Sequence, residues 1–292
     1  MENGVSTWVY RLRHDDEIFY VRILPEPDAS LVPEAVVHDR LQSLGLRVPH
    51  VMMVEDRNAV LDRSVMVTTA ISGQPLSEIV PAEHNHLPAI LRDAGQELAL
   101  LNQLPVDGFG WIRRDQPVST TLVGEHASYR SWVKAPLDEA LSQLSGVILT
   151  DTDVAIVSNA VDALFNDRAD TSAILAHGDL DLTHVYHDNG RYTGIIDFGE
   201  VRGTDRWYDL AHFRLHDREQ MPISTLRGLL DGYEMVTALP HDIEMQLTVD
   251  GLVNGLLALA RSHRKAGRTW SAYQRFLLQA VQRDIDTIRR ML

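Results

Sequence analysis

The chain has 292 residues and 45% of them are apolar, which is enough for one large domain or two unequal lobes with their own cores. It contains no cysteine, which excludes disulfides, thiolate catalysis and zinc–thiolate sites. The formal net charge of −14 disfavours nucleic-acid binding through a broad basic surface. Such a charge would attract a cationic small molecule, but it also serves solubility.

Residues 5–70 have the pattern of a small sheet with one helix. Two β-branched and aromatic segments, VSTWVYRL (5–12) and EIFYVRIL (17–24), predict a hairpin. A short helix is predicted over about 33–44, with Pro33 in its first turn and a glycine directly after it. Two further strands are predicted in the segments VPHVMMVED (48–56) and RSVMVTTAI (63–71).

After Gly73 the pattern becomes helical, with apolar residues at helical spacing over 87–101, 247–259 and 273–288. We therefore expect a sheet-rich N-terminal lobe over 1–72 and a helical C-terminal lobe over 73–292. The hinge is expected at 68–73, and a ligand is expected in the cleft between the lobes. No segment reaches about 18 uninterrupted apolar residues, and the N-terminus has no secretion signal. We therefore expect a cytoplasmic protein that does not associate with membranes.

Two motifs interrupt the helical region, HGDLDLTHVY at 177–186 and GIIDFGE at 194–200. The Asn189-Gly190 pair between them is a strong signal for a tight hairpin turn. The motifs are therefore predicted to lie side by side as the two strands of one hairpin.

Regular pairing from that turn places His184 opposite Ile195, with Asp197 two residues further along on the same face. Asp179 lies in the loop before the first strand. A loop carboxylate, an imidazole and a second carboxylate are thus expected to converge.

These three side chains suit phosphoryl transfer. The reaction needs a carboxylate that orients the attacking hydroxyl, ligands for Mg²⁺, and cations beside the phosphates. Asp179 suits the first role, and His184 and Asp197 suit the second. Their order and five-residue step match the protein-kinase pattern H-R-D-x-x-x-x-N followed by D-F-G.

On the HGDL and IIDFGE motifs, the chain resembles the aminoglycoside phosphotransferase family of small-molecule kinases. The resemblance implies an α+β, two-lobed, protein-kinase-like fold. It also implies Mg²⁺-dependent transfer of the γ-phosphate of ATP or GTP to a hydroxyl of a small molecule. By position, Asp179 resembles the catalytic base and Asp197 the principal metal ligand. His184 takes the place of a metal-binding asparagine.

The phosphate-binding lysine of this family corresponds to Arg22, and the helix residue that pairs with it corresponds to Glu34; both are assigned to nucleotide binding. Arginine keeps the positive charge but changes the geometry. The Gly-rich loop is reduced to Gly4, Ser6 and Thr7. These two substitutions, arginine for lysine and histidine for asparagine, resemble those of the macrolide kinases within the family.

Four residues after these motifs are also of interest. Asp209 is expected to hold the backbone of the catalytic loop, as the residue at this point of the resembled fold does. His212, His216 and Asp217 could line the acceptor pocket or lie on a helix surface.

Other functions stay open. A nucleotide-binding pseudokinase or regulatory module would explain the poor Gly-rich loop. A metal-dependent hydrolase would use a binuclear cluster of His177, Asp179, His184, His187 and Asp197, although hairpin parity points His187 to the face opposite His184. For a kinase, the acceptor could be an aminoglycoside, a macrolide or another antibiotic, with antibiotic resistance as the result. It could also be a metabolite such as a sugar or choline.

Overall fold

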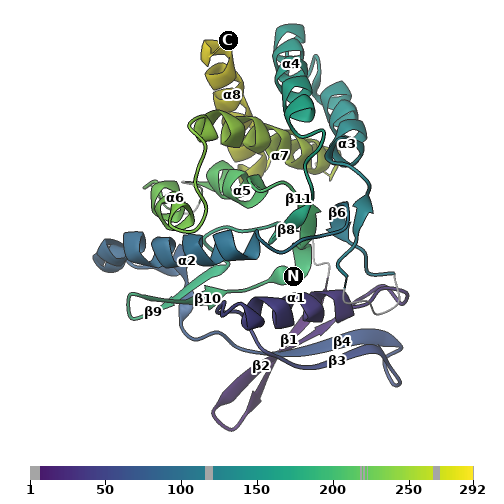
Figure 1. The fold of residues 1–292 in the computed structure, drawn as a ribbon, viewed down its shortest axis with the longest axis vertical. Helices are drawn as coiled ribbons and strands as arrows, with labels where there is room; N and C mark the ends of the chain where they lie inside the picture. The colour runs from purple at the N-terminus through teal and green to yellow at the C-terminus, as the bar shows by residue number, and fades with distance from the viewer. Residues whose placement is uncertain are drawn as a thin grey trace.

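The computed structural model describes residues 7–115, 121–217, 219, 221, 223–265 and 270–291. Figure 1 shows a four-stranded sheet at one end of the molecule, with helix α1 (Val32–Ser43) beside it. Helix α2 (Leu87–Leu101) crosses the middle, and the remaining helices gather at the opposite end. The mixed α+β architecture is therefore the one expected.

The N-terminal sheet is fully antiparallel, in the order β1-β2-β4-β3. Its strands are β1 (Trp8–His14), β2 (Glu17–Ile23), β3 (Val51–Asn58) and β4 (Arg63–Thr69). The four predicted strands and the predicted helix are all present. Helix α1 has proline in its first turn, where the missing N–H has no intrahelical partner to lose.

A short connection leads from this sheet into α2. It contains β5 (Gln74–Pro75) and the 3₁₀ helices η1 (Leu76–Glu78) and η2 (Pro81–His86). Helix α2 packs against α6 (Leu226–Glu234) and against β10 of the motif hairpin. The segment predicted to be helical over 87–101 is this helix.

Helix α7 (Ile243–Lys265) lies at the centre of the helical lobe and contacts α3, α5 and α8. By length and composition alone, Ile243–Arg264 could cross a bilayer, but 61% of that apolar window is buried inside the molecule, as in a core helix. The other helices of this lobe are α3 (Tyr129–Leu144), α4 (Asp151–Asp167), α5 (Tyr208–His216) and α8 (Ala272–Met291).

Two small sheets position the motifs within this lobe. One has the order β7-β6-β11-β8, from β6 (Phe109–Ile112), β7 (Gly124–His126), β8 (Ile174–Ala176) and β11 (Arg202–Thr204). The other has the order β10-β9-β5, from β9 (Val185–Asp188), β10 (Arg191–Ile195) and β5. The loop of the first motif, residues 177–184, follows β8 and is the expected catalytic loop, and the second motif connects β10 to β11.

The motif hairpin turns at Asn189 and Gly190, both with positive φ (47° and 73°), as a type I′ turn requires. Pairing follows the predicted register only as far as Tyr192, which lies opposite His187. Thr193 is then an extra residue, a β-bulge.

The bulge corrects the predicted pairing of His184. Beyond it, Ile195 lies opposite Val185, and the backbone N–H of Ile196 donates to the carbonyl of His184 (3.0 Å). The prediction that His184 faces Ile195 is therefore wrong by one residue. Thr193 is held in the bulge by a hydrogen bond from its hydroxyl to the carbonyl of Ser72 (2.7 Å).

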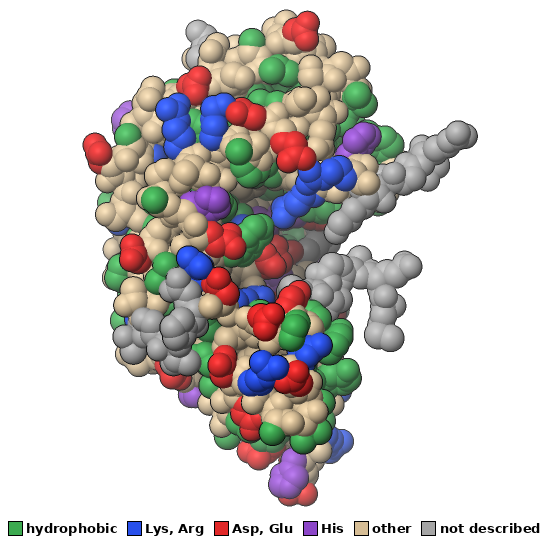
Figure 2. Space-filling view, turned by 90° about the vertical axis from the view of Figure 1, so that its right-hand side faces the viewer, with side chains coloured by type: hydrophobic (Ala, Val, Ile, Leu, Met, Phe, Trp, Pro, Cys, Tyr) green, Lys and Arg blue, Asp and Glu red, His purple; other side chains and the backbone are tan. Residues whose placement is uncertain are grey.

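Charged side chains of both signs are interspersed on the face shown in Figure 2. The net charge of −14 is thus not gathered into one acidic area on this face.

Candidate active site

The catalytic loop follows β8, and Asp209 holds its backbone. The backbone N–H groups of His177 and Gly178 each donate to the Asp209 carboxylate at 2.9 Å, and the Asn102 amide donates to it at 3.2 Å. Asp209 lies in the first turn of α5 and is fully buried. A buried carboxylate with three donors fixes the loop, so the expected role of Asp209 is confirmed.

Gly178 gives this loop its shape. Its φ of 90° is one that side chains rarely adopt, and a Cβ there would lie 2.0 Å from the carbonyl oxygen of Glu200. The two motifs can therefore pass closely only because this residue has no side chain. The turn then presents Asp179 on the side of α5.

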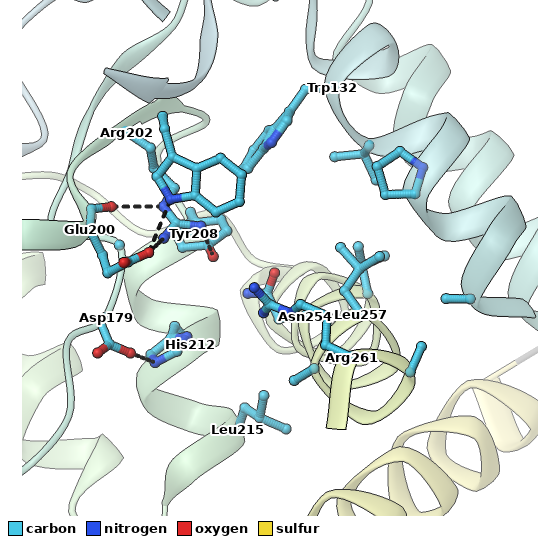
Figure 3. Close-up of a pocket in the computed structure, with 18 of the residues that line it drawn as sticks. Trp132, Asp179, Glu200, Arg202, Tyr208, His212, Leu215, Asn254, Leu257 and Arg261 are labelled. Carbon is cyan, nitrogen blue, oxygen red and sulfur yellow. Dashed lines mark hydrogen bonds and ion pairs between the residues drawn. The ribbon is translucent and has the colours of Figure 1, made fainter. Parts of the chain in front are cut away.

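The Asp179 carboxylate is about half exposed, and its Oδ1 lies 3.2 Å from Nε2 of His212, outside good hydrogen-bond geometry (Figure 3). Burial raises the pKa of Asp179, but the contact with His212 and the nearby histidines outweigh burial and lower the pKa to about 2. Burial lowers the pKa of His212. Asp179 is thus ionised at neutral pH, while His212 is neutral.

His184 is oriented by the same loop. Its Nδ1 lies 2.7 Å from the backbone carbonyl oxygen of Asp179, and because a carbonyl only accepts, Nδ1 carries the proton. The Nε2 lone pair is then directed toward Asp197, whose Oδ2 lies 3.9 Å away. Histidines that bind metals are commonly fixed in this way by a carbonyl at the other ring nitrogen.

Asp197 has a left-handed backbone (φ 64°) and a side chain that is 51% exposed. Magnesium usually takes only one or two protein ligands and fills its other positions with water and phosphate oxygens. The open pair of Asp197 and His184 fits that requirement, although imidazole nitrogen is a less usual ligand for Mg²⁺ than oxygen.

The binuclear cluster finds no support in this geometry. Among the described residues, no group of three or more histidine, aspartate or glutamate side chains is arranged to hold a metal ion. His187, which that hypothesis needs, is buried.

Arg22 joins this pair from the N-terminal lobe. Its Nη1 donates to Oε1 of Glu34, the predicted partner, and lies 3.4 Å from Oδ1 of Asp197. Glu34 is buried, which raises its pKa even though Arg22 and Arg114 oppose the shift. Arg114, which the sequence did not single out, donates to the carbonyl of Gly199 (2.6 Å).

The reduced Gly-rich loop lies mostly outside the described residues, since Gly4 and Ser6 precede them. Thr7 is buried, and Nη2 of Arg22 donates to its hydroxyl at 3.4 Å. Two of the cavities are lined in part by residues of the two motifs. The smaller, of about 200 Å³, lies between β2, the end of β4 and Asp197, and its lining includes residues 68–71 of the expected hinge.

The larger cavity, of about 430 Å³, opens beside Asp179 within the helical lobe. Helices α3, α5, α7 and α8 supply most of its lining, including Trp132, Tyr208, His212, His216, Asn254, Leu257, Arg261 and Tyr273 (Figure 3). Of the residues left open, His212 and His216 therefore line it. Asp217 instead accepts hydrogen bonds from the backbone and hydroxyl of Thr225.

Three further residues of this cavity were missed by the sequence interpretation. Trp111 donates through Nε1 to Oε2 of Glu200 (3.0 Å), and Arg202 reaches the same oxygen at 3.1 Å. Glu200 belongs to the GIIDFGE motif and could have been singled out there. Trp111 and Arg202 lie on short strands that carry no comparable signal.

Comparisons with known proteins identify relatives that are similar in sequence or in fold. Hygromycin-B 4-O-kinase of Escherichia coli is 25% identical over 181 residues, 60% of this chain and 50% of the relative, so the match spans half the length of that protein. A thermostable mutant of aminoglycoside phosphotransferase APH(4)-Ia superposes with a TM-score of 0.68 at 20% identity, covering 100% of this chain and 93% of the other. Amicoumacin kinase hAmiN superposes with a TM-score of 0.66 at 14% identity, covering 100% and 91%.

These structures share the two-lobed, protein-kinase-like fold. Residues 1–244 match the phosphotransferase enzyme family, and the chain therefore belongs to this family of small-molecule kinases.

Proposed function

We propose that the protein transfers the γ-phosphate of ATP or GTP, with Mg²⁺, to a hydroxyl of a small molecule held in the 430 Å³ cavity. One observation carries this proposal. The side chain of Asp179 lines that cavity, while its backbone carbonyl fixes His184 beside Asp197. A single residue thus joins the acceptor site to the site for the metal and phosphates.

Asp179 orients the acceptor hydroxyl. As an ionised carboxylate it accepts a hydrogen bond from the hydroxyl and directs the oxygen toward the phosphate. The transition state of phosphoryl transfer is loose, so positioning matters more than base strength, and a carboxylate with a pKa of about 2 is adequate. Asp179 takes the hydroxyl proton as the new bond between the acceptor oxygen and the γ-phosphorus forms, and the bond from that phosphorus to the bridging oxygen breaks, so that the nucleoside diphosphate leaves with the electron pair.

Asp197 and His184 would hold Mg²⁺, which supplies positive charge to the phosphate oxygens when it is bound. Arg22, paired with Glu34, adds a permanent cation beside them. The smaller cavity at the expected hinge would take the nucleotide base.

The relatives support a hydroxylated acceptor of antibiotic size. APH(4)-Ia has been solved with AMP-PNP and hygromycin B together, and the amicoumacin kinase hAmiN with AMP-PNP, Ca²⁺ and Ami. If the acceptor is an antibiotic, phosphorylation would confer resistance. A fructosamine-3-kinase-like structure from Thermobifida fusca, with a TM-score of 0.62, keeps a sugar-bearing metabolite as the alternative acceptor.

A nucleotide-coupled screen of antibiotics and sugars tests the proposal, with Asp179→Asn as the diagnostic variant. The substitution should lower kcat by roughly 10²–10⁴ and leave nucleotide binding and Tm unchanged. Asp188→Asn, the same chemical change at the exposed motif hairpin, is the control and should keep full activity. Undiminished transfer by Asp179→Asn would refute the assignment, and nucleotide binding without turnover would favour a regulatory module.

A further inference from the structure

The acceptor cavity differs in charge from the rest of the protein. Its described lining contains three carboxylates and three guanidinium groups, whereas the whole chain has 41 acidic and 27 basic residues. The carboxylates are Glu139, Asp179 and Glu200, and the guanidinium groups are Arg202, Arg261 and Arg264. The pairing among these groups decides which charges remain for a ligand.

Two of the carboxylates are already neutralised by arginines of the cavity. Glu200 accepts from Arg202 at 3.1 Å, and Glu139 accepts from Arg264 at 2.6 Å. Asp179 is committed to the acceptor hydroxyl. A polycationic acceptor would therefore have to compete with these arginines for the carboxylates. The competition is strongest at Glu200, because its partner Arg202 is only 9% exposed, whereas Glu139 and Arg264 form an exposed pair.

Once these ion pairs are formed, the charge of the cavity that remains available to a ligand is positive. Arg261 forms no ion pair or hydrogen bond with any residue in the described part of the chain. Asn254 lies two turns before it on the same face of α7, and its buried Nδ2 has no acceptor among the described atoms. Figure 3 shows both side chains reaching from α7 into the cavity. Within the described part of the chain, two donors on one helix face thus have no protein acceptor, and the Arg261 side chain is exposed and so open to a ligand.

Other parts of the cavity lining are aromatic. Trp111 and Tyr273 are each 41% exposed, unusual for large rings, and Trp132 is only partly buried. The Arg202 guanidinium lies over the rings of Trp111 and Tyr208, at 5.4 and 5.0 Å from their centroids, which holds these rings in place. A flat or apolar ligand body would cover this surface.

We infer that the acceptor is a hydroxylated molecule with an apolar or aromatic ring and one anionic oxygen group, a carboxylate or a phosphate, bound by Arg261 and Asn254. This inference rests on the proposed function, because it names the acceptor class of the same site. The anionic group would accept two parallel hydrogen bonds from the planar guanidinium and a third from the amide. Arg261 is thereby a specificity-determining residue.

Matched ligands test this inference on the full chain. Phenyl β-glucuronide, phenyl β-glucoside and phenyl β-glucoside 6-phosphate differ in the anionic group alone, and hygromycin B serves as the polycation. Calorimetric titration should show the carboxylate or the phosphate binding at least about tenfold more tightly than the neutral glucoside. Whichever anion binds more tightly identifies the group.

Arg261→Glu should abolish this preference, and Arg261→Lys should keep part of it. Arg227→Glu is the matched control, since it makes the same charge change on α6, where Arg227 is exposed and pairs with Asp231 outside the cavity. It should leave the preference unchanged.

Equal binding of the neutral glucoside, or an anion preference that survives Arg261→Glu, would overturn the inference. Asp179-dependent phosphorylation of hygromycin B with no binding of either anion would overturn it too, yet would support the proposed kinase. Binding of the anions that depends on Arg261, without phosphate transfer to any acceptor, would support the anion site at Arg261 and Asn254 but would count against the kinase and so overturn the assignment of the anion as part of an acceptor.

Discussion

At the scale of single residues, Asp209 links the buried core to the catalytic loop. It accepts from two backbone N–H groups and from Asn102, which is itself held by the hydroxyl of Tyr233 (3.1 Å). The position of Asp179, the proposed catalytic residue, thus depends on a buried carboxylate that does not line the cavity.

Asp209→Asn keeps the shape of the side chain but turns an amide NH₂ toward a backbone donor. We expect the free energy of unfolding to fall by about 1–3 kcal/mol and kcat to fall with it, because the loop loses an acceptor. Urea denaturation and steady-state kinetics measure the two effects. Asp242→Asn is the control, because Asp242 is exposed and its carboxylate accepts from the Gln246 side chain, far from the loop. If Asp209→Asn had the wild-type free energy of unfolding and the wild-type kcat, the loop would not depend on the Asp209 carboxylate for its conformation.

His38 gives the fold a pH dependence. Burial lowers its pKa from 6.5 to about 4, against the opposing effect of its hydrogen bond to the Pro49 carbonyl. The unfolded chain therefore takes up a proton before the folded protein does. The contribution of His38 is complete above pH 6.5 and is lost as the pH falls toward 4, up to roughly 3 kcal/mol.

His38→Gln removes the titrating group and keeps a donor for the Pro49 carbonyl. Urea denaturation between pH 7.5 and pH 4.5 should show a smaller loss of stability for the variant than for the wild type. The difference between the two curves is the measurement, because burial also lowers the pKa of His177. If the free energy of unfolding fell equally with pH in the variant and the wild type, protonation of His38 would not destabilise the folded protein.

At the scale of elements, the motif hairpin depends on its turn. Gly190 has a φ of 73°, and a Cβ there would lie 2.7 Å from the His86 ring. Gly190→Ala should therefore lower the free energy of unfolding by about 1–2 kcal/mol. Asn189→Gly, one residue earlier at a φ of 47°, should be nearly neutral because glycine tolerates that conformation. Equal effects in urea denaturation would contradict the turn assignment.

The same hairpin shows how far sequence reasoning reaches. The Asn189-Gly190 signal is local, so it predicted the turn correctly. The bulge at Thr193 arises from tertiary contacts, since Thr193 bonds to Ser72, and Ile195 donates to the carbonyl of Arg47 (3.0 Å) in the other lobe. No local pattern encodes those partners, so the register beyond the bulge could not be predicted.

At the scale of the whole molecule, the cavity was the least predictable part. Trp111, Arg202 and Arg261 come from segments far apart in the chain, and each has an ordinary sequence context. Asp179, His184 and Asp197 lie within nineteen positions of one another, so it could be inferred from one hairpin that His184 lies beside Asp197 and the Asp179 loop. The enzyme family could thus be recognised from sequence, whereas the acceptor class proposed above depends on tertiary packing.

The two lobes are joined by Glu97 of α2. Its buried carboxylate accepts from the backbone N–H and Nε of Arg47, at 2.9 and 2.6 Å, and from the hydroxyl of Tyr192 at 2.8 Å. Arg47 also donates to the Tyr192 carbonyl (3.2 Å) and lies over the Tyr192 ring. The loop after α1 is thereby fixed to the strand that leads to Asp197.

Glu97→Ala should leave the Tyr192 hydroxyl and the Arg47 backbone N–H without an acceptor, lowering the free energy of unfolding by about 2 kcal/mol. Glu97→Gln keeps one carbonyl acceptor and should cost less. Because the N-terminal sheet would then unfold more independently, calorimetry of Glu97→Ala should show a broadened or split transition. The exposed Glu26→Ala is the control. A single sharp transition at the wild-type Tm would mean that the lobes are held together by their other contacts, with Arg22 and Asp197 the first pair to test.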